Sequence, residues 1–265
     1  QILKKNILYL PTYRSKPQRE YSRSTDNYLA NKLFSIHDGH LKIVRETSSR
    51  ITPWNFKSMG MRFIFTNEMI KLFGFGKYLT FTPNNYNGNF ELLLVGTNNE
   101  KTNICDLGYG IYNLISLFLL IDIAAADIQI DYIDNKKGIF GGKYISKYSD
   151  KIVLIEEPEI SLHPNYQSLL ADVFFQAHHK YGLKFIVETH SEYIIRKMQY
   201  LIAKGDSDIS LDDLLIYYFG NKESEDRIKK IKILEDGFLS EEFGSGFVDE
   251  ATKTIFDIWT LPKRN

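Results

Sequence analysis

The chain has 265 residues, of which 43% are hydrophobic and 25% charged, a composition typical of a soluble globular protein with a sizeable core. Its 33 basic residues balance its 33 acidic ones, which argues against a broadly basic, DNA-coating surface. The single cysteine excludes an internal disulfide. Because no secretory signal is recognisable either, we expect a reducing, cytoplasmic compartment.

The region 1–103 is expected to form an irregular N-terminal portion that contains strands and a lid-like insertion. It begins with a short apolar strand over 7–10, which a basic stretch follows. This stretch contains Arg14, Lys16, Arg19 and Arg23. Runs of charge are usually solvated surface, and contact with nucleic acid is the alternative interpretation. A short helix over 67–73 and two strands over 78–82 and 90–95, joined by a turn-rich segment, complete this portion.

The region 104–265 alternates strands with helices, which predicts an α/β fold with a mostly parallel sheet flanked by helices. The run from Ile111 to Ile123 is the most apolar of the chain. It is shorter than the roughly 20 residues that span a bilayer, so we interpret it as a buried helix. The expected helices cover 110–127 and 164–182, and a further helix that follows Ser191 ends at Gly205. The expected strands cover 151–155, 184–187, 214–219 and 227–234, and a C-terminal helix ends the chain's pattern.

Two glutamates end the apolar strand over 151–155. A continuous apolar run predicts a strand buried on both faces. Parallel sheets place their ligands at the carboxyl ends of their strands. Adjacent carboxylates are costly to hold together unless a cation or a phosphate-activated water shares the site. Glu156 and Glu157 are therefore candidate site residues, and a solvated acidic turn is the alternative.

A histidine follows the next apolar strand. His190 comes just after the strand over 184–187, and Ser191 is a plausible N-cap for the helix beyond it. The separation of about 30 residues from Glu156 fits one βαβ crossover, so we expect the two strands to be neighbours in the sheet. Taken alone, a histidine at such a place is more often a surface or capping residue than a catalytic one.

Three segments together resemble a known family. Residues 156–164, EEPEISLHP, resemble the Walker B strand end and D-loop of ABC-type ATPases, and residues 188–195, ETHSEYII, resemble their switch-histidine loop. Residues 106–113, DLGYGIYN, are similar to the signature segment in the divergent form of the RecF/SMC-like and OLD-like group. The order of these segments is that of the family. The first residues and the tail over 236–250 are further similar to ATPases of prokaryotic anti-phage systems of the retron or Septu kind.

The resemblance implies ATP and Mg²⁺ as cofactors and a role for each matching residue. Glu156 would help to hold Mg²⁺, Glu157 would be the general base that polarises the attacking water, and His190 would sense the γ-phosphate. The signature residues would contact ATP bound by a second protomer, and the D-loop would lie nearby. These residues are Gly108, Gly110 and Asn113 in the signature, and Ser161 and His163 in the D-loop. Tyr112 departs from the small hydroxyl residue that is usual in the signature.

One expected motif does not occur in the chain. There is no Gly-x-x-x-x-Gly-Lys-Ser/Thr segment, although this phosphate-cradling loop normally precedes the signature of such ATPases. The chain also begins at Gln1 without an initiator methionine. We therefore expect the Walker A part to lie upstream, and we expect this chain alone not to hydrolyse ATP.

The resemblance predicts the ATPase subunit of a prokaryotic defence complex. ATP would be sandwiched in a homodimer or higher oligomer and would gate an associated effector. The expected partners are a separate effector nuclease, a reverse transcriptase–ncRNA complex or both, with DNA or RNA contact left open and no membrane contact. The chain lacks the spaced acidic cluster of a metal-dependent nuclease after His190. The alternatives are a RecF-like DNA-repair ATPase, and a nucleotide-bound scaffold with little turnover.

Overall fold

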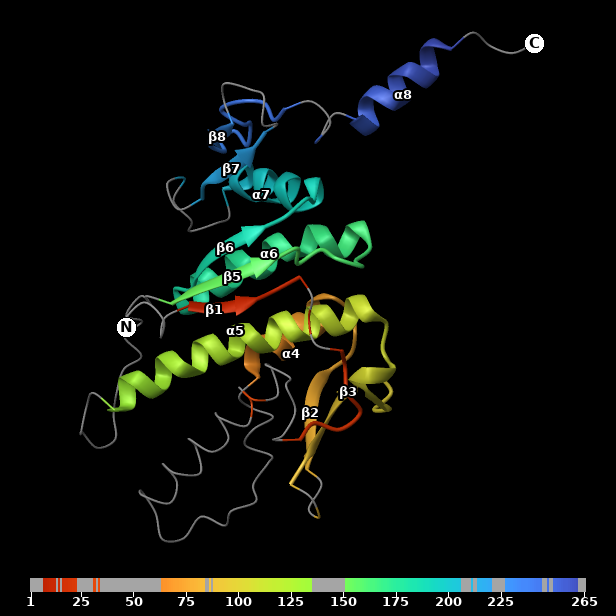
Figure 1. Ribbon diagram of the computed structural model, residues 1–265, viewed down its shortest axis with the longest axis vertical. Coiled ribbons are helices and arrows are strands. Elements are labelled where there is room, and N and C mark those ends of the chain that lie inside the picture. Colours follow the sequence, from red (N-terminus) through yellow and green to blue (C-terminus); the bar gives the residue numbers. More distant parts are fainter. Residues whose placement is uncertain are drawn as a thin grey trace. The chain divides into compact units, whose positions relative to one another are not determined.

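The computed structural model (Figure 1) divides into two compact units. The first contains Gln1–His163 and Gln176–Thr189, and the second contains Pro164–Phe175 and His190–Asn265. The domain boundary expected near residue 104 stays a prediction. The structure describes residues 7–12, 14, 16–22, 31, 33, 63–83, 86, 88–134, 151–205, 211, 214–220, 227–244, 247 and 250–261.

A parallel three-stranded sheet lies in the first unit (Figure 1). It consists of β1 (Ile7–Leu10), β5 (Ile152–Glu156) and β6 (Lys184–Glu188), in the order β1-β5-β6. All three strands occur where the apolar runs predicted them. Helix α6 (Pro164–Tyr181) connects β5 to β6 and ends at Gly182, whose φ of 65° suits a glycine. The predicted α/β fold with a parallel sheet flanked by helices is confirmed.

The prediction that β5 is buried on both faces was wrong. Val153 and Ile155 are completely buried on one face. On the other face, in register across the three strands, Tyr9 is 42% exposed, Leu154 half-buried and Ile186 55% exposed. The run of apolar residues therefore predicted the strand correctly but not the exposure of its second face.

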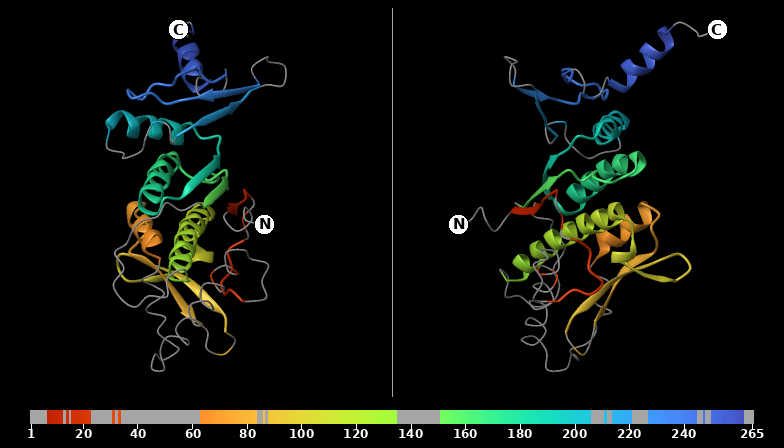
Figure 2. Two further views of the ribbon diagram at one scale, coloured as in Figure 1. Left: turned by 90° about the vertical axis from the view of Figure 1, so that its left-hand side faces the viewer. Right: turned by 45° about the vertical axis from the view of Figure 1, so that its right-hand side comes forward.

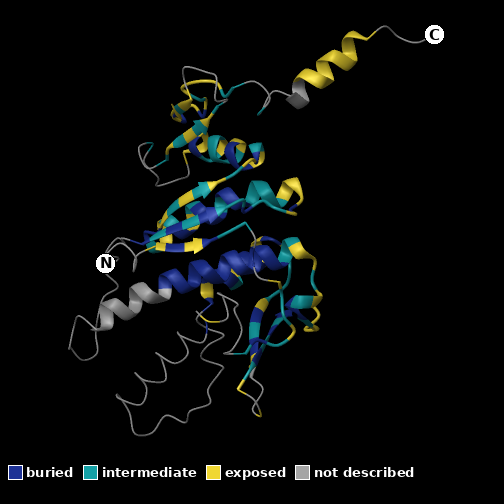
Figure 3. Cartoon of the chain, in the orientation of Figure 1, coloured by how far each residue is buried: buried dark blue, intermediate teal, exposed yellow. Residues whose placement is uncertain are grey.

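The long helix α5 (Tyr109–Asp134) forms the core of the first unit. Its described side chains from Tyr112 to Ala125 are all buried, as the dark segment in Figure 3 shows. A helix that is apolar on every side must be buried, because it leaves no polar face for water. The buried helix predicted over 110–127 is confirmed, and it continues to Asp134. No helix within the described residues is both long and apolar enough to cross a membrane.

A small antiparallel sheet and a short helix complete the described part of the first unit. Helix α4 packs against α5 and β2 (Figure 2). The strands pair in the order β2-β3-β4, so the predicted hairpin is confirmed. The bounds of these elements, together with a single 3-10 turn, are α4 (Ile64–Leu72), β2 (Tyr78–Pro83), β3 (Phe90–Val95), β4 (Lys101–Asn103) and η1 (Ile104–Asp106).

A buried carboxylate joins α5 to α4. Asp122 accepts hydrogen bonds from the backbone N–H groups of Phe65 and Thr66, at 3.2 Å to Oδ1 and 2.8 Å to Oδ2. These N–H groups belong to the first turn of α4, where the helix itself provides no acceptor. The N-cap residue of α4, Phe63, makes no side-chain cap bond. Asp122 of α5 therefore caps the N-terminus of α4 from a neighbouring helix.

The second unit contains the beginning of α6, helix α7 (Glu192–Lys204) and a separate hairpin. The Ser191 hydroxyl accepts from the N–H of Ile194 at 3.4 Å, and Gly205 ends α7 in the left-handed conformation, so both predicted ends are confirmed. Strands β7 (Ile216–Phe219) and β8 (Ile228–Ile231) pair antiparallel in a sheet of their own rather than joining the parallel one. The C-terminal helix is α8 (Glu250–Thr260).

Candidate functional site

Two residues of the β1 segment hold the carboxylate of Glu156 at the end of β5. The Tyr9 hydroxyl donates to Oε1 at 2.5 Å, and the backbone N–H and the hydroxyl of Thr12 each donate to Oε2 at 3.1 Å. Because these bonds favour the charged form, the Tyr9 hydroxyl and then the Thr12 N–H hold the pKa of Glu156 below its usual value. Glu156 therefore presents an ionised, oriented carboxylate, which suits a hard cation such as Mg²⁺.

The sequence did not indicate Tyr9 and Thr12 as site residues. Tyr9 pairs with Leu154 across the sheet, and Glu156 lies two residues further along β5, so all three share one face. The alternation along each strand is visible in the sequence. The sequence does not show that β1 and β5, which are far apart in the chain, pair with each other. This pairing brings Tyr9 to Glu156.

Replacing Tyr9 with phenylalanine is expected to raise the pKa of Glu156 toward its ordinary value. The substitution removes the donor that contributes most to the low pKa, while the bonds from Thr12 remain. The measurement is a carboxyl-carbon NMR titration of Glu156. Tyr78→Phe, at another half-exposed strand tyrosine, serves as the control and should leave the titration unchanged. An equal titration of Glu156 in both variants would contradict the assignment.

The turn after β5 places Glu157 in strained backbone. Glu157 and Ser161 have positive φ angles of 41° and 60°, which residues other than glycine seldom adopt. The Glu157 N–H donates to the carbonyl of Glu188 at the end of β6, at 2.9 Å, and the Glu157 carbonyl accepts from Ile160 at 3.2 Å. Such strain persists only where surrounding bonds hold it, and it gathers at functional sites. The residue expected to act as general base thus occupies a rigid position between the ends of two strands.

The signature segment meets the D-loop within the same chain. The Gly108 carbonyl accepts from the N–H groups of Ile111 and Tyr112 at 3.0 and 3.2 Å, which starts α5. Within this first turn, the backbone of Gly110 lies so close to the Ser161 carbonyl that a side chain at Gly110 would overlap it. The structure therefore brings two predicted site segments together, and it explains why a glycine is needed at position 110.

Replacing Gly110 with alanine is expected to lower the free energy of unfolding by about 1–3 kcal/mol, because the added methyl group must displace the D-loop backbone. Gly108→Ala is the matched control, since a methyl group there has no atom within 4 Å. Urea unfolding of both variants measures the difference. Equal losses of stability in both would show that the close approach to Ser161 does not constrain position 110.

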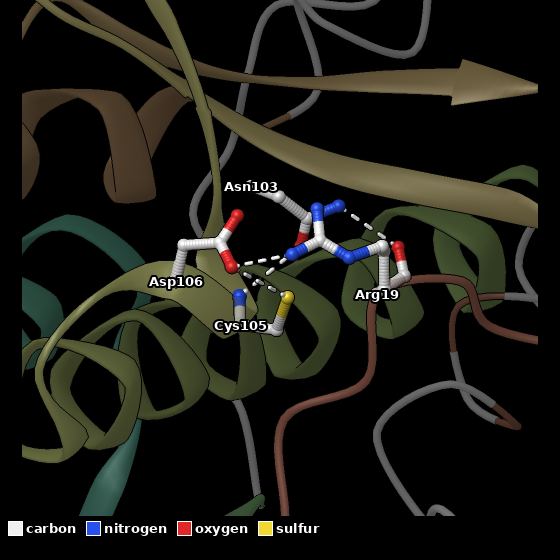
Figure 4. Close-up of polar contacts among 4 residues, drawn as sticks. All are labelled: Arg19, Asn103, Cys105 and Asp106. Carbon is white, nitrogen blue, oxygen red and sulfur yellow. Dashed lines mark hydrogen bonds and ion pairs between the residues drawn. The ribbon is translucent and has the colours of Figure 1, made fainter.

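The basic stretch is only partly a solvated surface, since one arginine is buried and a second is paired, while Lys16 is exposed. Arg14 is buried, and Arg19 pairs at 2.5 Å with Asp106, the first residue of the signature segment (Figure 4). The same cluster includes Asn103, whose side chain donates to the Arg19 carbonyl at 2.9 Å and accepts from the Cys105 N–H at 3.1 Å. These bonds fasten the stretch to the start of the signature. Arg23 lies outside the described residues.

The remaining predicted site residues lie as follows. The Asn113 side chain is almost completely buried in α5, at 1% exposure. His163 is exposed at the end of the D-loop, immediately before α6. His190 is exposed and belongs to the second unit, whereas Glu156 and Glu157 belong to the first. Its place in a common site with them stays a prediction.

Comparison with known proteins gives one family match. A family described as AAA ATPase domain matches residues 6–195, and no curated protein matches the chain. A solved structure titled "Structural biochemistry of ATP-driven dimerization and DNA stimulated activation of SMC ATPases" is 13% identical, with 78% of this chain and 95% of that chain covered and a TM-score of 0.42. The Smc head domain with a coiled coil and joint from Pyrococcus yayanosii is 13% identical, with 87% and 35% covered and a TM-score of 0.42. The SMC head domain from Thermotoga maritima is 13% identical, with 74% and 52% covered and a TM-score of 0.37.

Proposed function

The chain belongs to the AAA ATPase domain family, and we propose that it supplies the catalytic acids of an ATP-hydrolysing protein. The observation that carries this proposal is the acidic turn after β5. There Glu156 is held ionised by Tyr9 and Thr12, and Glu157 is fixed in strained backbone next to it. One oriented carboxylate beside a second, rigidly placed one provides a cation ligand and a base at the same edge of the sheet.

Mg²⁺ and ATP fit the residues at this edge. Among the described residues, no group of three or more His, Cys, Asp or Glu side chains gathers to hold a metal. Mg²⁺ in nucleotide sites needs only one or two carboxylates, because phosphates and water supply its other ligands. Glu156 would hold the ion, which would neutralise charge on the phosphates. Glu157 would accept a proton from the attacking water, and His190 would sense the terminal phosphate.

The signature and the D-loop would serve a second copy of the protein. Gly108 and Gly110 lie at the N-terminus of α5, where free N–H groups and the helix dipole favour an anion. With Asn113 they would contact ATP carried by the partner, while Ser161 and His163 of the D-loop would lie near the same interface. ATP would then be sandwiched between two protomers. The close approach of Gly110 to the Ser161 backbone supports a role for both segments at one interface.

The likeness of the motifs to anti-phage ATPases extends the proposal to a defence complex. In it, the ATP-bound dimer would gate a separate effector nuclease, with a reverse transcriptase–ncRNA complex as a further partner. A RecF-like ATPase of DNA repair is the alternative. It is distinguished by ATP-dependent duplex binding that weakens steeply with salt. A nucleotide-bound scaffold with little turnover is the other alternative.

The test is a measurement of nucleotide binding, hydrolysis and assembly by a protein that joins this chain to a phosphate-binding loop. The expected result is binding of Mg²⁺–ATP, release of phosphate, and a doubling of mass by light scattering when ATP is added. Binding and assembly with no phosphate release would favour the scaffold. Failure to bind ATP would overturn the proposed function altogether.

A further inference from the structure

Gln167 of α6 contacts the segment that carries His190. The hydroxyl of Ser191, the residue directly after His190, donates a hydrogen bond to Oε1 of Gln167 at 2.6 Å. Ser191 is only 4% exposed, whereas Gln167 is half-buried and His190 is exposed. All three residues belong to the second unit, where Gln167 lies near the start of α6 and Ser191 is the N-cap of α7.

Two hydrogen bonds hold the Ser191 hydroxyl from different directions. The hydroxyl accepts from the N–H of Ile194 at 3.4 Å, which caps the first turn of α7. A hydroxyl has a single hydrogen, and Gln167 is its acceptor. Because Ser191 is buried, loss of the Gln167 amide would take this acceptor from a buried donor, which is unfavourable. Gln167 therefore restrains the side chain that caps α7.

A restrained Ser191 sets the direction in which the His190 side chain points. The His190 side chain is exposed, so packing does little to orient it. Its direction depends on its backbone, which is joined to Ser191 by one rigid peptide plane. Ser191 has the extended backbone typical of an N-cap, with a φ of −89° and a ψ of 112°. A change in these torsion angles would turn the peptide plane and move the imidazole ring.

A second contact joins the same two helices further from the histidine. Lys197 Nζ of α7 lies 3.4 Å from Oδ2 of Asp172 in α6, and the two side chains are 24% and 19% exposed. Lys197 lies more than one helical turn beyond Ser191. The ion pair therefore ties α7 to α6 in the body of the helices, while the bond from Ser191 to Gln167 ties the cap itself.

We propose that Gln167 is a positioning residue for His190, which it holds through the Ser191 hydroxyl in the orientation needed at the terminal phosphate of ATP. This inference rests on the proposed role of His190 and adds a residue to it. Gln167 acts through Ser191 and not on a reacting atom. Its effect is on the geometry of the catalytic step, in which a displacement of about 1 Å can slow the reaction by roughly 100-fold.

The first experiment measures the backbone order of His190 in the full chain by ¹⁵N relaxation. Gln167→Leu removes the acceptor and keeps most of the volume. The order parameter of the His190 N–H should fall from about 0.85, the value of rigid backbone, toward 0.6. Gln167→Glu keeps an acceptor oxygen and should preserve the order. Lys197→Met breaks the second contact and is the matched control, which should also leave His190 ordered.

The second experiment measures steady-state phosphate release by a protein that joins this chain to a phosphate-binding loop. Gln167→Leu should lower kcat by roughly 10- to 100-fold and leave KM within a few-fold, because His190 acts on the reacting phosphate and contributes little to ATP binding. Gln167→Glu should restore most of kcat. If Lys197→Met lowered kcat as much as Gln167→Leu, general loosening of α6 and α7 would explain the result, and the inference would be overturned.

The two experiments separate this inference from the proposed function. If His190 loses order in Gln167→Leu but the unaltered joined protein releases no phosphate, the positioning by Gln167 stands and the ATPase proposal fails. If the unaltered protein hydrolyses ATP and Gln167→Leu keeps its full kcat, the ATPase proposal stands and the role of Gln167 is refuted. Unchanged order of His190 in Gln167→Leu would refute that role as well.

Discussion

Replacing Glu157 with glutamine is expected to slow ATP hydrolysis by roughly 10²- to 10⁴-fold while leaving the affinity for ATP almost unchanged. Glutamine has the same shape and fits the same strained turn, whose φ of 41° belongs to the backbone, but its amide cannot accept a proton from water. Binding would persist, since Glu156 keeps its bonds to Tyr9 and Thr12. Steady-state phosphate release and ATP titration, in a protein that joins this chain to a phosphate-binding loop, measure the two effects.

Glu188→Gln is the matched control for this experiment. Glu188 is an exposed acid at the end of the adjoining strand, in register with Glu156, and its backbone carbonyl, which accepts from Glu157, is retained by the substitution. We expect its turnover to stay within a few-fold of the unaltered protein. If Glu157→Gln turned over ATP as fast as Glu188→Gln, the assignment of Glu157 as the general base would be wrong.

Replacing Asp122 with alanine is expected to lower the free energy of unfolding by about 2–5 kcal/mol. Two buried N–H donors at the start of α4 would lose this carboxylate as their acceptor, and each unsatisfied donor costs about 1–3 kcal/mol. Asp122→Asn is the control, because its carbonyl oxygen can still accept from one of the two donors, so it should cost less. Urea unfolding at pH 7, where Asp122 is mostly ionised, measures both variants. Wild-type stability in Asp122→Ala would show that α4 does not depend on this cap.

The same carboxylate makes stability depend on pH. Burial raises the pKa of Asp122 in the folded state to about 6, from the value of 3.8 that is usual for an exposed aspartate. The folded state therefore binds the proton more tightly than the unfolded state. Protonation of Asp122 contributes up to about 3 kcal/mol to the free energy of unfolding. This contribution is fully present below pH 4 and is lost as the pH rises through 6. The Asp122→Asn variant should lack this loss of unfolding free energy with rising pH. Unfolding curves taken between pH 4 and pH 7 can test this.

Local chemistry explains why much of the fold could be predicted from the sequence. The ends of α7 follow from Ser191 and Gly205, since a hydroxyl caps the first turn and a glycine accepts the left-handed conformation at the last. The apolar runs of β5 and β6 and the all-apolar α5 are likewise signals carried by neighbouring residues. The resemblance to ABC-type ATPases rests on such local segments and their order along the chain, so it too was accessible before the structure.

Contacts between distant segments decided the rest. Tyr9 and Glu156 are 147 residues apart in the chain, and only the parallel pairing of β1 with β5 makes the tyrosine a partner of the acid. Arg14 was interpreted as one charge of a solvated run, yet the structure buries it. The strands β7 and β8 were assigned correctly, but a strand pattern does not tell whether its partner is parallel or antiparallel.

The sequence by itself therefore indicated the acidic turn as the candidate site, because motif, strand end and spacing are all local properties. Only the tertiary structure decided how those residues are held. The bonds from Tyr9 and Thr12 to Glu156, the approach of Gly110 to Ser161, and the burial of Arg14 and Asp122 all depend on long-range packing. Packing brings together residues that are far apart in the chain, and nothing in the sequence near either residue indicates that they meet. Packing also buries Arg14 and Asp122, and a charge is costly because it is buried.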